Sequence, residues 1–314
     1  TPQIARMDAR SLPESSERRL CYVGTVIRGS GDALGGSRAP IQLGGELFGA
    51  DNATSDHEVL DLLAELLIEL GVPEGVFDLG HVGIFRSLAE GAGLTSAQIE
   101  CLRDATARKA VPEIRTALAE WSVAADYAQA LVSLCQLSGP VEQVAEQANS
   151  RIAPLLDQSG REALQRLTEV ARLLQRYHSA RHQILVDLAE VHGYHYHTGL
   201  VFAVYLPRLG RALARGGRYN NIGNAFGRAR PAIGFSLDLR DLAAFAPRQV
   251  REQLPVYAPA DSSDPELREA VLALRRRGRR VISTMDNIQK KPARLERSGD
   301  NQQTWQLVED KNDG

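Results

Sequence analysis

Segment 42–46, with the sequence QLGGE, carries the side chains best suited to binding a small charged ligand. Residues four apart on a β-strand point to the same face, so Gln42 and Glu46 would place an amide beside a carboxylate. Arg38 lies four residues earlier in the same phase, and Arg28 lies at the other end of the preceding glycine-rich segment. Carboxylates bind ammonium groups and guanidinium groups bind carboxylates, so this set would suit a zwitterionic ligand. A ladder of surface salt bridges is the alternative.

Two pairs of histidines have spacings that can hold a metal ion. His195 and His197 lie two apart on a predicted strand and would share a face, while His178 and His182 are four apart on a predicted helix. The sequence contains no H-E-x-x-H motif, and half-buried or ligand-contacting histidines also have these spacings. We therefore expect no metal site and no cofactor. A metal-dependent hydrolase that uses His192, His195 and His197 is the alternative that this cluster leaves open.

Motifs for nucleotide binding are absent from the sequence. It contains neither G-x-G-x-x-G nor G-K-[S/T], which excludes a P-loop as a sequence match. The one dense basic run, residues 275–280, could contact phosphates, but such runs at a helix end are more typically solvated. The net charge of −2 argues against a protein that binds nucleic acid or anionic membrane over its whole surface.

The hydrophobic pattern places segment 42–46 within a β-hairpin. Leu20–Ile27 and Ile41–Phe48 are apolar and contain β-branched residues, which favours strands. Gly29–Gly36 lies between them and is typical of a loop. The sequence therefore predicts two antiparallel strands that would present the charged residues together.

Helices dominate the middle of the chain. Apolar residues recur at helical spacing over Asp56–Leu70, and Ser55 or Asp56 is the expected cap. From Thr95 to about Leu188 the pattern is almost wholly helical. Between these stretches we expect a short strand at Val76–Leu79 and a helix at Val82–Gly91.

Strand character returns after the helical stretch. Tyr194–Leu206 is rich in Val, Tyr and Phe, Ala232–Asp238 predicts another strand, and the RGGRY sequence at 215–219 is typical of a glycine turn. Strands, then helices, then strands indicate an α+β fold, with an antiparallel sheet flanked by helices and a helical region at about 95–190.

A change in composition near residue 250 predicts a domain boundary. Residues 1–250 would form the core, and residues 251–314 a small C-terminal α/β domain with a polar tail. Its expected elements are a strand at Val256–Ala258, a helix at Pro265–Arg277 and a strand at Arg280–Thr284. A chain of 314 residues can bury enough apolar surface to fold without disulfides.

Cysteine usage and hydropathy predict a cytoplasmic protein. Cys21, Cys101 and Cys135 are widely spaced and form no C-x-x-C pair, which favours a reducing compartment. No apolar run approaches the ~20 residues of a membrane helix. The sequence begins at Thr1 rather than Met, so we expect that residues precede it in the native protein.

Several spaced motifs together resemble the core of the class II histidyl-tRNA synthetases. Within that lineage the sequence is most similar to the regulatory subunits of ATP phosphoribosyltransferase. The likeness covers nearly all of residues 1–245 and is carried in order by TPQIARMDA at 1–9, CYVGTVIR at 21–28 with SRAPIQLGGELFG at 37–49, GYHYHTGLVF at 193–202, RGGRY at 215–219 and GFSLDLR at 234–240. These segments resemble the start of the ligand-binding region, the second signature motif, the two histidine motifs and the third signature motif.

Four departures from the synthetase pattern remove its catalytic groups. The first histidine motif of the synthetases begins with an activating Arg, which is His192 here. His195 and His197 replace its Asp and its last Tyr, and Asp241 replaces the Arg of the third motif that holds ATP. Because an acid repels a triphosphate, the resemblance predicts no aminoacylation, no tRNA partner and no catalytic residue.

The resemblance implies a non-catalytic regulatory subunit of ATP phosphoribosyltransferase. Such a subunit is required for the first step of histidine biosynthesis and for feedback inhibition by histidine, an allosteric effect. Its implied partners are a short-form catalytic subunit, histidine as effector, and a second copy of itself within a hetero-oligomer, with no membrane. The implied effector-binding residues are Thr1, Arg28, Arg38, Gln42, Glu46, Tyr196, His197, Gly217 and Tyr219. An adenylate-forming ligase related to histidyl-tRNA synthetase is the alternative function.

Overall fold

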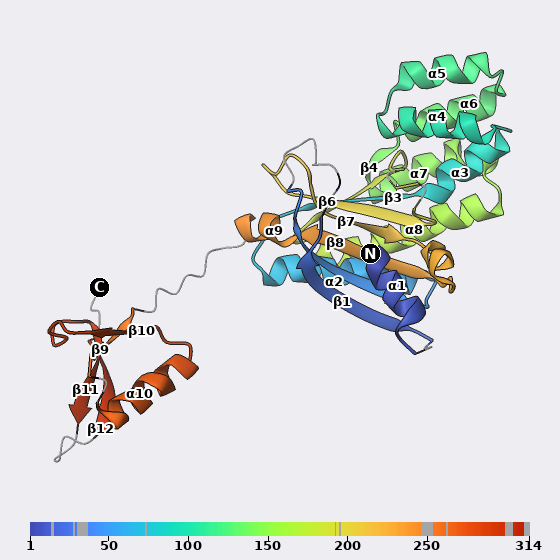
Figure 1. The fold of residues 1–314 in the computed structure, drawn as a ribbon. Coiled ribbons are helices and arrows are strands. Elements are labelled where there is room, and N and C mark those ends of the chain that lie inside the picture. The colour runs from blue at the N-terminus through green and yellow to red at the C-terminus, as the bar shows by residue number, and fades with distance from the viewer. Residues whose placement is uncertain are drawn as a thin grey trace. The chain divides into compact units, whose positions relative to one another are not determined.

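The polypeptide divides into two compact units, Thr1–Pro247 and Arg248–Gly314. Figure 1 shows the fold as a computed structural model. The structure describes residues 1–13, 16–27, 29, 37–72, 74–191, 193–194, 196–245, 254–261, 263–298 and 304–310. Each unit is described by itself.

An eight-stranded sheet with the order β1-β2-β8-β7-β6-β3-β5-β4 organises the first unit. The strands are β1 (Arg18–Thr25), β2 (Ile41–Phe48), β3 (Val76–His81), β4 (Ser138–Pro140), β5 (Gln183–Asp187), β6 (Leu200–Tyr205), β7 (Ala212–Arg218) and β8 (Ala232–Asp238). All neighbouring strands are antiparallel except β3 and β5. The predicted hairpin is confirmed, because β1 pairs with β2.

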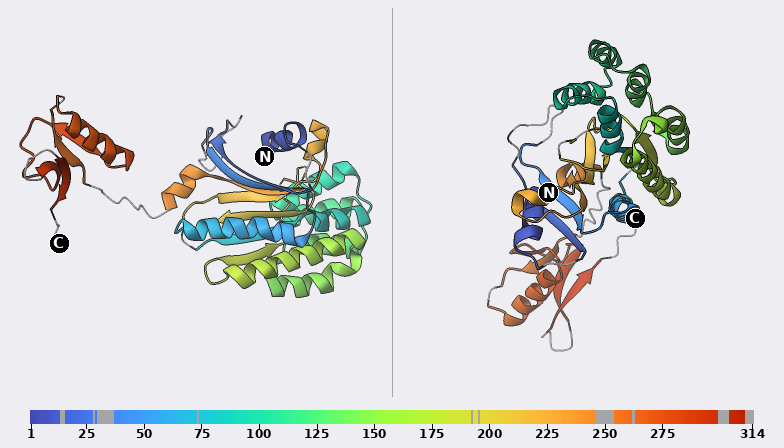
Figure 2. Two further views of the ribbon diagram at one scale, coloured as in Figure 1. Left: turned by 90° about the horizontal axis from the view of Figure 1, so that it is seen from below. Right: turned by 90° about the vertical axis from the view of Figure 1, so that its right-hand side faces the viewer.

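Helices cover both faces of this sheet, as Figure 2 shows. The helices of the first unit are α1 (Pro2–Arg10), α2 (Ala53–Glu69), α3 (Val82–Gly91), α4 (Ser96–Ala107), α5 (Val111–Glu120), α6 (Ala125–Leu134), α7 (Val141–Arg151), α8 (Gln158–His178) and α9 (Leu239–Phe245), with short 3₁₀ turns at η1 (Ala153–Leu155) and η2 (Ile222–Phe226). Helices α2 and α8 lie on one face, and α1 with η2 lies on the opposite face. The predicted α+β class is confirmed.

The core lies between the sheet and the apolar faces of α2 and α8. Leucines at helical spacing, such as Leu60, Leu63 and Leu67 of α2, are fully buried, and so are Leu167 and Leu174 of α8. Such burial contributes about 1.5–3 kcal/mol for each large apolar side chain. The two helices therefore fix the position of the sheet that carries β2.

Helix α2 begins earlier than its apolar pattern indicates. Ser55 and Asp56 are not its cap: Asn52 accepts a hydrogen bond from the Ser55 amide, and the Ser55 hydroxyl accepts one from the Asn52 amide. This reciprocal pair satisfies two backbone donors that the first turn would leave free. The polar residues before the apolar stripe thus belong to the helix.

Three other sequence predictions are wrong. Segment Gln183–Asp187 is the strand β5, because a short buried parallel strand is apolar throughout and periodicity does not distinguish it from a helix. Strand β6 begins at Leu200 rather than Tyr194, so His197 lies in a turn before it. The glycines of 215–219 lie within strand β7 rather than in a turn, because they pair with β6 and β8.

The second unit is built on a four-stranded sheet with the order β10-β9-β11-β12. Its elements are β9 (Val256–Pro259), α10 (Pro265–Arg276), β10 (Val281–Thr284), β11 (Ala293–Ser298) and β12 (Thr304–Glu309). The expected α/β pattern is present, but the polar tail holds two further strands that the sequence analysis missed. Among the described residues, no helix is both long and apolar enough to cross a lipid bilayer.

Candidate functional site

Glu46 lies at the centre of a buried polar cluster on β2. Its side chain has almost no exposed surface, and the Tyr219 hydroxyl donates a hydrogen bond to Oε2. The Tyr22 hydroxyl donates to Oε1 at 3.3 Å, and Gln42 Nε2 donates to the same Tyr22 oxygen at 3.2 Å. Gln42 and Glu46 therefore share a face of the strand, as their spacing predicts.

A glycine on the neighbouring strand makes room for this carboxylate. Gly234 of β8 lies opposite Glu46 in the sheet register. A Cβ atom at position 234 would lie 1.7 Å from Glu46 Oε2 and 2.7 Å from the Gly45 carbonyl oxygen. Since backbone cannot move aside easily, only glycine at this position allows the Glu46 side chain to lie across the sheet.

Burial sets the protonation behaviour of the cluster. It raises the pKa of Glu46, although hydrogen bonds from Tyr219 and Tyr22 act in the opposite direction. Burial and the nearby Glu46 carboxylate also raise the pKa of Tyr22 to about 12 and that of Tyr219 well above its ordinary value. The two phenols therefore remain protonated at neutral pH and donate to Glu46, while the carboxylate favours a cationic partner.

Thr1, which precedes α1, lies beside the same carboxylate. Its backbone nitrogen lies 3.9 Å from Glu46 Oε1 and 3.4 Å from the Tyr22 hydroxyl oxygen. Thr1 therefore borders the Glu46 carboxylate, and its part in binding a ligand remains a prediction.

The turn before β6 adds two aromatic side chains. The Tyr196 ring lies 5.2 Å from the Tyr219 ring and 5.2 Å from the His197 ring, centroid to centroid. Tyr196 Oη is buried and has no hydrogen-bond partner among the described residues. A Cβ at Gly217 would come within 2.8 Å of His197 Cδ2, so Gly217 provides space for that imidazole. We refer to Tyr22, Gln42, Glu46, Tyr196 and Tyr219 as the Glu46 cluster.

Arg38 is not among the contacts of this cluster within the described part of the chain. Arg38 is exposed and precedes β2, and it donates to the Gly29 carbonyl oxygen at 3.3 Å. Its part in binding a ligand carboxylate remains a prediction. Arg28, His192 and His195 lie outside the described residues.

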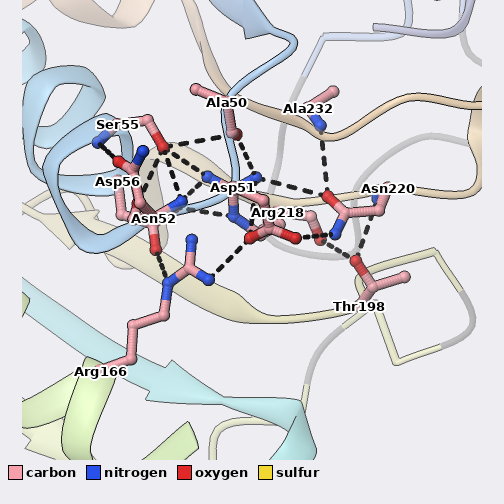
Figure 3. A network of polar contacts seen from close by, with 10 residues as sticks. All are labelled: Ala50, Asp51, Asn52, Ser55, Asp56, Arg166, Thr198, Arg218, Asn220 and Ala232. Carbon is pink, nitrogen blue, oxygen red and sulfur yellow. Dashed lines mark hydrogen bonds and ion pairs between the residues drawn. The ribbon is translucent and has the colours of Figure 1, made fainter. Parts of the chain in front are cut away.

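A second buried network holds the elements that surround the cluster, as Figure 3 shows. Arg218, at the end of β7, is 2% exposed and donates twice to Asp56 Oδ1, at 2.9 and 2.6 Å. Arg166 of α8 donates to the other Asp56 oxygen at 2.5 Å and to Asp51 at 2.7 Å. Two guanidinium groups and two carboxylates thus balance in charge, with Arg218 and Asp56 buried and Asp51 40% exposed.

This network also reaches the turn that carries Tyr196. The Asn220 side-chain amide donates to Asp51 at 2.8 Å, and the Asn220 backbone N–H donates to Thr198 Oγ1 at 3.0 Å. Thr198 is two residues from Tyr196, and Arg218 immediately precedes Tyr219. The network therefore fixes both backbone segments from which the aromatic rings of the cluster extend.

Sequence reasoning missed Tyr22, Gly234 and Arg218. Tyr22 lies directly opposite Gly44 in the hairpin, but that register depends on the length and path of the connecting loop. Gly234 begins the GFSLDLR motif and Arg218 lies in the RGGRY motif. The motifs alone do not reveal that Gly234 faces the Glu46 carboxylate or that Arg218 binds Asp56.

Asp241 has a guanidinium partner. Arg211 donates to both of its carboxylate oxygens, at 2.5 and 2.7 Å. The pair lines a cavity of about 140 Å³ together with Asp238 and Gln42.

Comparisons with known proteins identify the family of the chain. A family model described as histidyl-tRNA synthetase matches residues 1–242. The chain is 46% identical over 290 residues to the ATP phosphoribosyltransferase regulatory subunit of Thioalkalivibrio sulfidiphilus, with 90% of this chain and 71% of the relative covered. It is 43% identical over 290 residues to the protein of the same description from Stutzerimonas stutzeri, with 91% and 71% covered.

Solved structures show the same fold. A Bacillus halodurans protein described as an ATP phosphoribosyltransferase regulatory subunit/histidyl-tRNA synthetase has a TM-score of 0.76 at 27% identity, with 90% of this chain and 73% of that chain covered. A chain of the ATP phosphoribosyl transferase (HisG:HisZ) complex from Thermotoga maritima has a TM-score of 0.59 at 20% identity, covering 75% and 78%. Histidyl-tRNA synthetase from Nostoc has a TM-score of 0.72 at 17% identity, covering 98% and 78%. The last two matches concern the fold alone. The chain belongs to the family of ATP phosphoribosyltransferase regulatory subunits, which is built on the histidyl-tRNA synthetase core.

Proposed function

We propose that this chain is a non-catalytic regulatory subunit that binds free histidine at the Glu46 cluster and conveys its inhibition to a separate, short-form catalytic subunit. In that complex the catalytic subunit would join ATP and phosphoribosyl pyrophosphate, the first step of histidine biosynthesis. The observation that carries the proposal is the buried Glu46 carboxylate, to which Tyr22 and Tyr219 donate hydrogen bonds.

The Glu46 cluster offers a partner for each polar group of histidine. The ligand ammonium would pair with the Glu46 carboxylate. The imidazole has both a donor and an acceptor nitrogen, so it suits the buried Tyr196 hydroxyl, the Gln42 amide or His197. Arg38 could bind the ligand carboxylate in a bidentate manner if its side chain turned from Gly29.

The Arg211–Asp241 pair supports a non-catalytic role. A synthetase needs a cation at this position to hold ATP, and a carboxylate there repels the phosphates. Both terminal nitrogens of Arg211 donate to Asp241, so that guanidinium is not free to replace the missing cation. The alternative, an adenylate-forming ligase, would require this pair to open.

The family of this chain and the assembly described for a relative support the proposal of a catalytic partner subunit. The Thermotoga maritima structure is a complex of two different proteins by its description. We infer that this chain likewise joins a catalytic subunit and pairs with a second copy of itself in the cytoplasm. Histidine acts allosterically there only if it binds more tightly to the inhibited state of the complex than to the active state.

Reconstitution tests the proposal. A short-form catalytic subunit from the same source is assayed for phosphoribosyl transfer with and without this chain extended by its native N-terminal residues. We expect a higher rate with the chain present and a joint peak on size exclusion at micromolar concentrations. No joint peak and an unchanged rate would contradict the assignment of a partner.

A further inference from the structure

A separate cluster of titratable side chains lies between helices α2 and α8. His178 is the last residue of α8, and its side chain is 2% exposed. Its Nε2 lies 2.7 Å from Asp61 Oδ1, and its Nδ1 lies 3.8 Å from Glu65 Oε1. Asp61 and Glu65 are four residues apart on α2 and therefore lie on one face of that helix.

The side chains of His178 and His182, whose spacing suggested a metal-binding pair, have different partners. Helix α8 ends at His178, although the His182 amide still donates to the His178 carbonyl oxygen at 2.9 Å. His182 Nδ1 instead accepts a hydrogen bond from the Gly75 amide at 3.2 Å, and its ring packs on Phe77. The acidic partners of His178 come from α2, where Asp61 lies 117 residues away in sequence, and no local spacing reveals this contact.

The two carboxylates face different nitrogens of the imidazole, Asp61 at Nε2 and Glu65 at Nδ1. One metal ion can bind only one of these nitrogens, so metal binding requires one carboxylate to rotate toward the nitrogen that the other faces. One candidate ligand atom from each of Asp61, Glu65 and His178 lies within 4.8 Å of the others.

We propose that Asp61, Glu65 and His178 form a binding site for a divalent transition metal ion, with Zn²⁺ as the best match. Zn²⁺ binds imidazole nitrogen and carboxylate oxygen at about 2.0–2.2 Å, which places neighbouring ligand atoms about 3.4 Å apart in a tetrahedral site. The two carboxylate side chains are 43% and 54% exposed, so they can rotate to reach those positions. Three protein ligands leave a fourth position open to water or to a further ligand.

Two neighbouring features favour an ion at this place. His57 lies one turn before Asp61 on α2, and its Nε2 is buried without a hydrogen-bond partner among the described residues. Asp61 and Glu65 also line a groove of about 480 Å³ between β1 and α2. The groove gives an ion access from solvent, and a second imidazole lies near the ligand set. The proposal does not depend on histidine binding at the Glu46 cluster.

Calorimetric titration with ZnCl₂ tests the site. The untagged chain is stripped with a chelator, dialysed and titrated, and we expect about one equivalent of Zn²⁺ to bind. Asp61→Asn and Glu65→Gln should each weaken that binding more than about tenfold, since each removes an anionic ligand. Glu69→Gln, an exposed change one turn further along α2, is the matched control and should leave binding unchanged.

Two further measurements distinguish a metal-binding site from a structural ion pair. Zn²⁺ should raise the melting temperature of the parent but not that of Glu65→Gln, because a ligand that binds only the folded state stabilises it. Co²⁺ should give visible absorption bands with the parent that Glu65→Gln loses. Absence of saturable Zn²⁺ binding, or binding that Asp61→Asn and Glu65→Gln leave unchanged, would overturn the proposal.

Discussion

Arg211 donates to both carboxylate oxygens of Asp241, at 2.5 and 2.7 Å. Both side chains are mostly buried, with 16% and 17% of their surface exposed. Asp241 stands where the synthetase pattern has an arginine, so an acid paired with a guanidinium lies at that position. This ion pair supports the proposal that the chain is non-catalytic.

The first prediction follows from this pair. The chain should catalyse no histidine-dependent exchange of pyrophosphate with ATP, because an acid at position 241 repels the triphosphate and Arg211 is occupied. An exchange assay with radiolabelled pyrophosphate, run beside an authentic histidyl-tRNA synthetase, measures this directly. Exchange well above the blank would favour the ligase alternative.

The second prediction concerns recognition of the ligand ammonium. Glu46→Gln keeps the shape of the side chain but removes its charge, which should weaken histidine binding by about 2–5 kcal/mol, or roughly 30-fold or more. Isothermal calorimetry of the parent and the variant measures the difference. Arg276→Ala, on an exposed position in the second unit, is the control and should bind histidine like the parent. Equal affinities for Glu46→Gln and the parent would move the effector site elsewhere.

The third prediction is a pH dependence of stability. Burial raises the pKa of Glu46 in the folded chain, so the folded state holds this proton more tightly than the unfolded state. Its contribution to stability is therefore present below the ordinary pKa of about 4.5 and is lost as the pH rises through the raised folded value. Urea unfolding of the parent and Glu46→Gln over a pH series should show the parent losing stability relative to the variant as pH rises. A difference that stays constant or grows with pH would contradict the shift.

The fourth prediction tests the network in Figure 3. Arg218→Met would leave the fully buried Asp56 with one of its two guanidinium partners, which should cost about 3–5 kcal/mol of unfolding free energy. Arg172→Met removes an ion pair with Glu142 in which both side chains are more than half exposed, and it should cost less than about 1 kcal/mol. Denaturant unfolding of both variants compares the two. A similar small loss for each would show that the buried network contributes little.

The sequence predicted the elements whose pattern is local. Strands Ile41–Phe48 and Ala232–Asp238 and helix Val82–Gly91 have the predicted bounds, because period-two and helical patterns are read directly from neighbouring residues. The shared face of Gln42 and Glu46 follows from the same rule.

Features that depend on tertiary contacts were not predictable in this way. The strand at Gln183–Asp187 is buried beside β3 and has no alternation to distinguish it from a helix. The partnership of His178 with Asp61 arises only when two helices pack together. Tyr22 joins the Glu46 cluster through strand register, which the hairpin sequence alone does not fix.

Histidine inhibition of the reconstituted complex shows whether the Glu46 cluster is the sensor. Parent chain and Glu46→Gln, each with its native N-terminal residues, are combined with the short-form catalytic subunit, and phosphoribosyl transfer is followed over a histidine titration. We expect both chains to raise the rate, and the Glu46→Gln complex to need roughly 30-fold more histidine for half-inhibition. Equal histidine sensitivity of the two complexes would contradict the claim that the Glu46 cluster is the sensor.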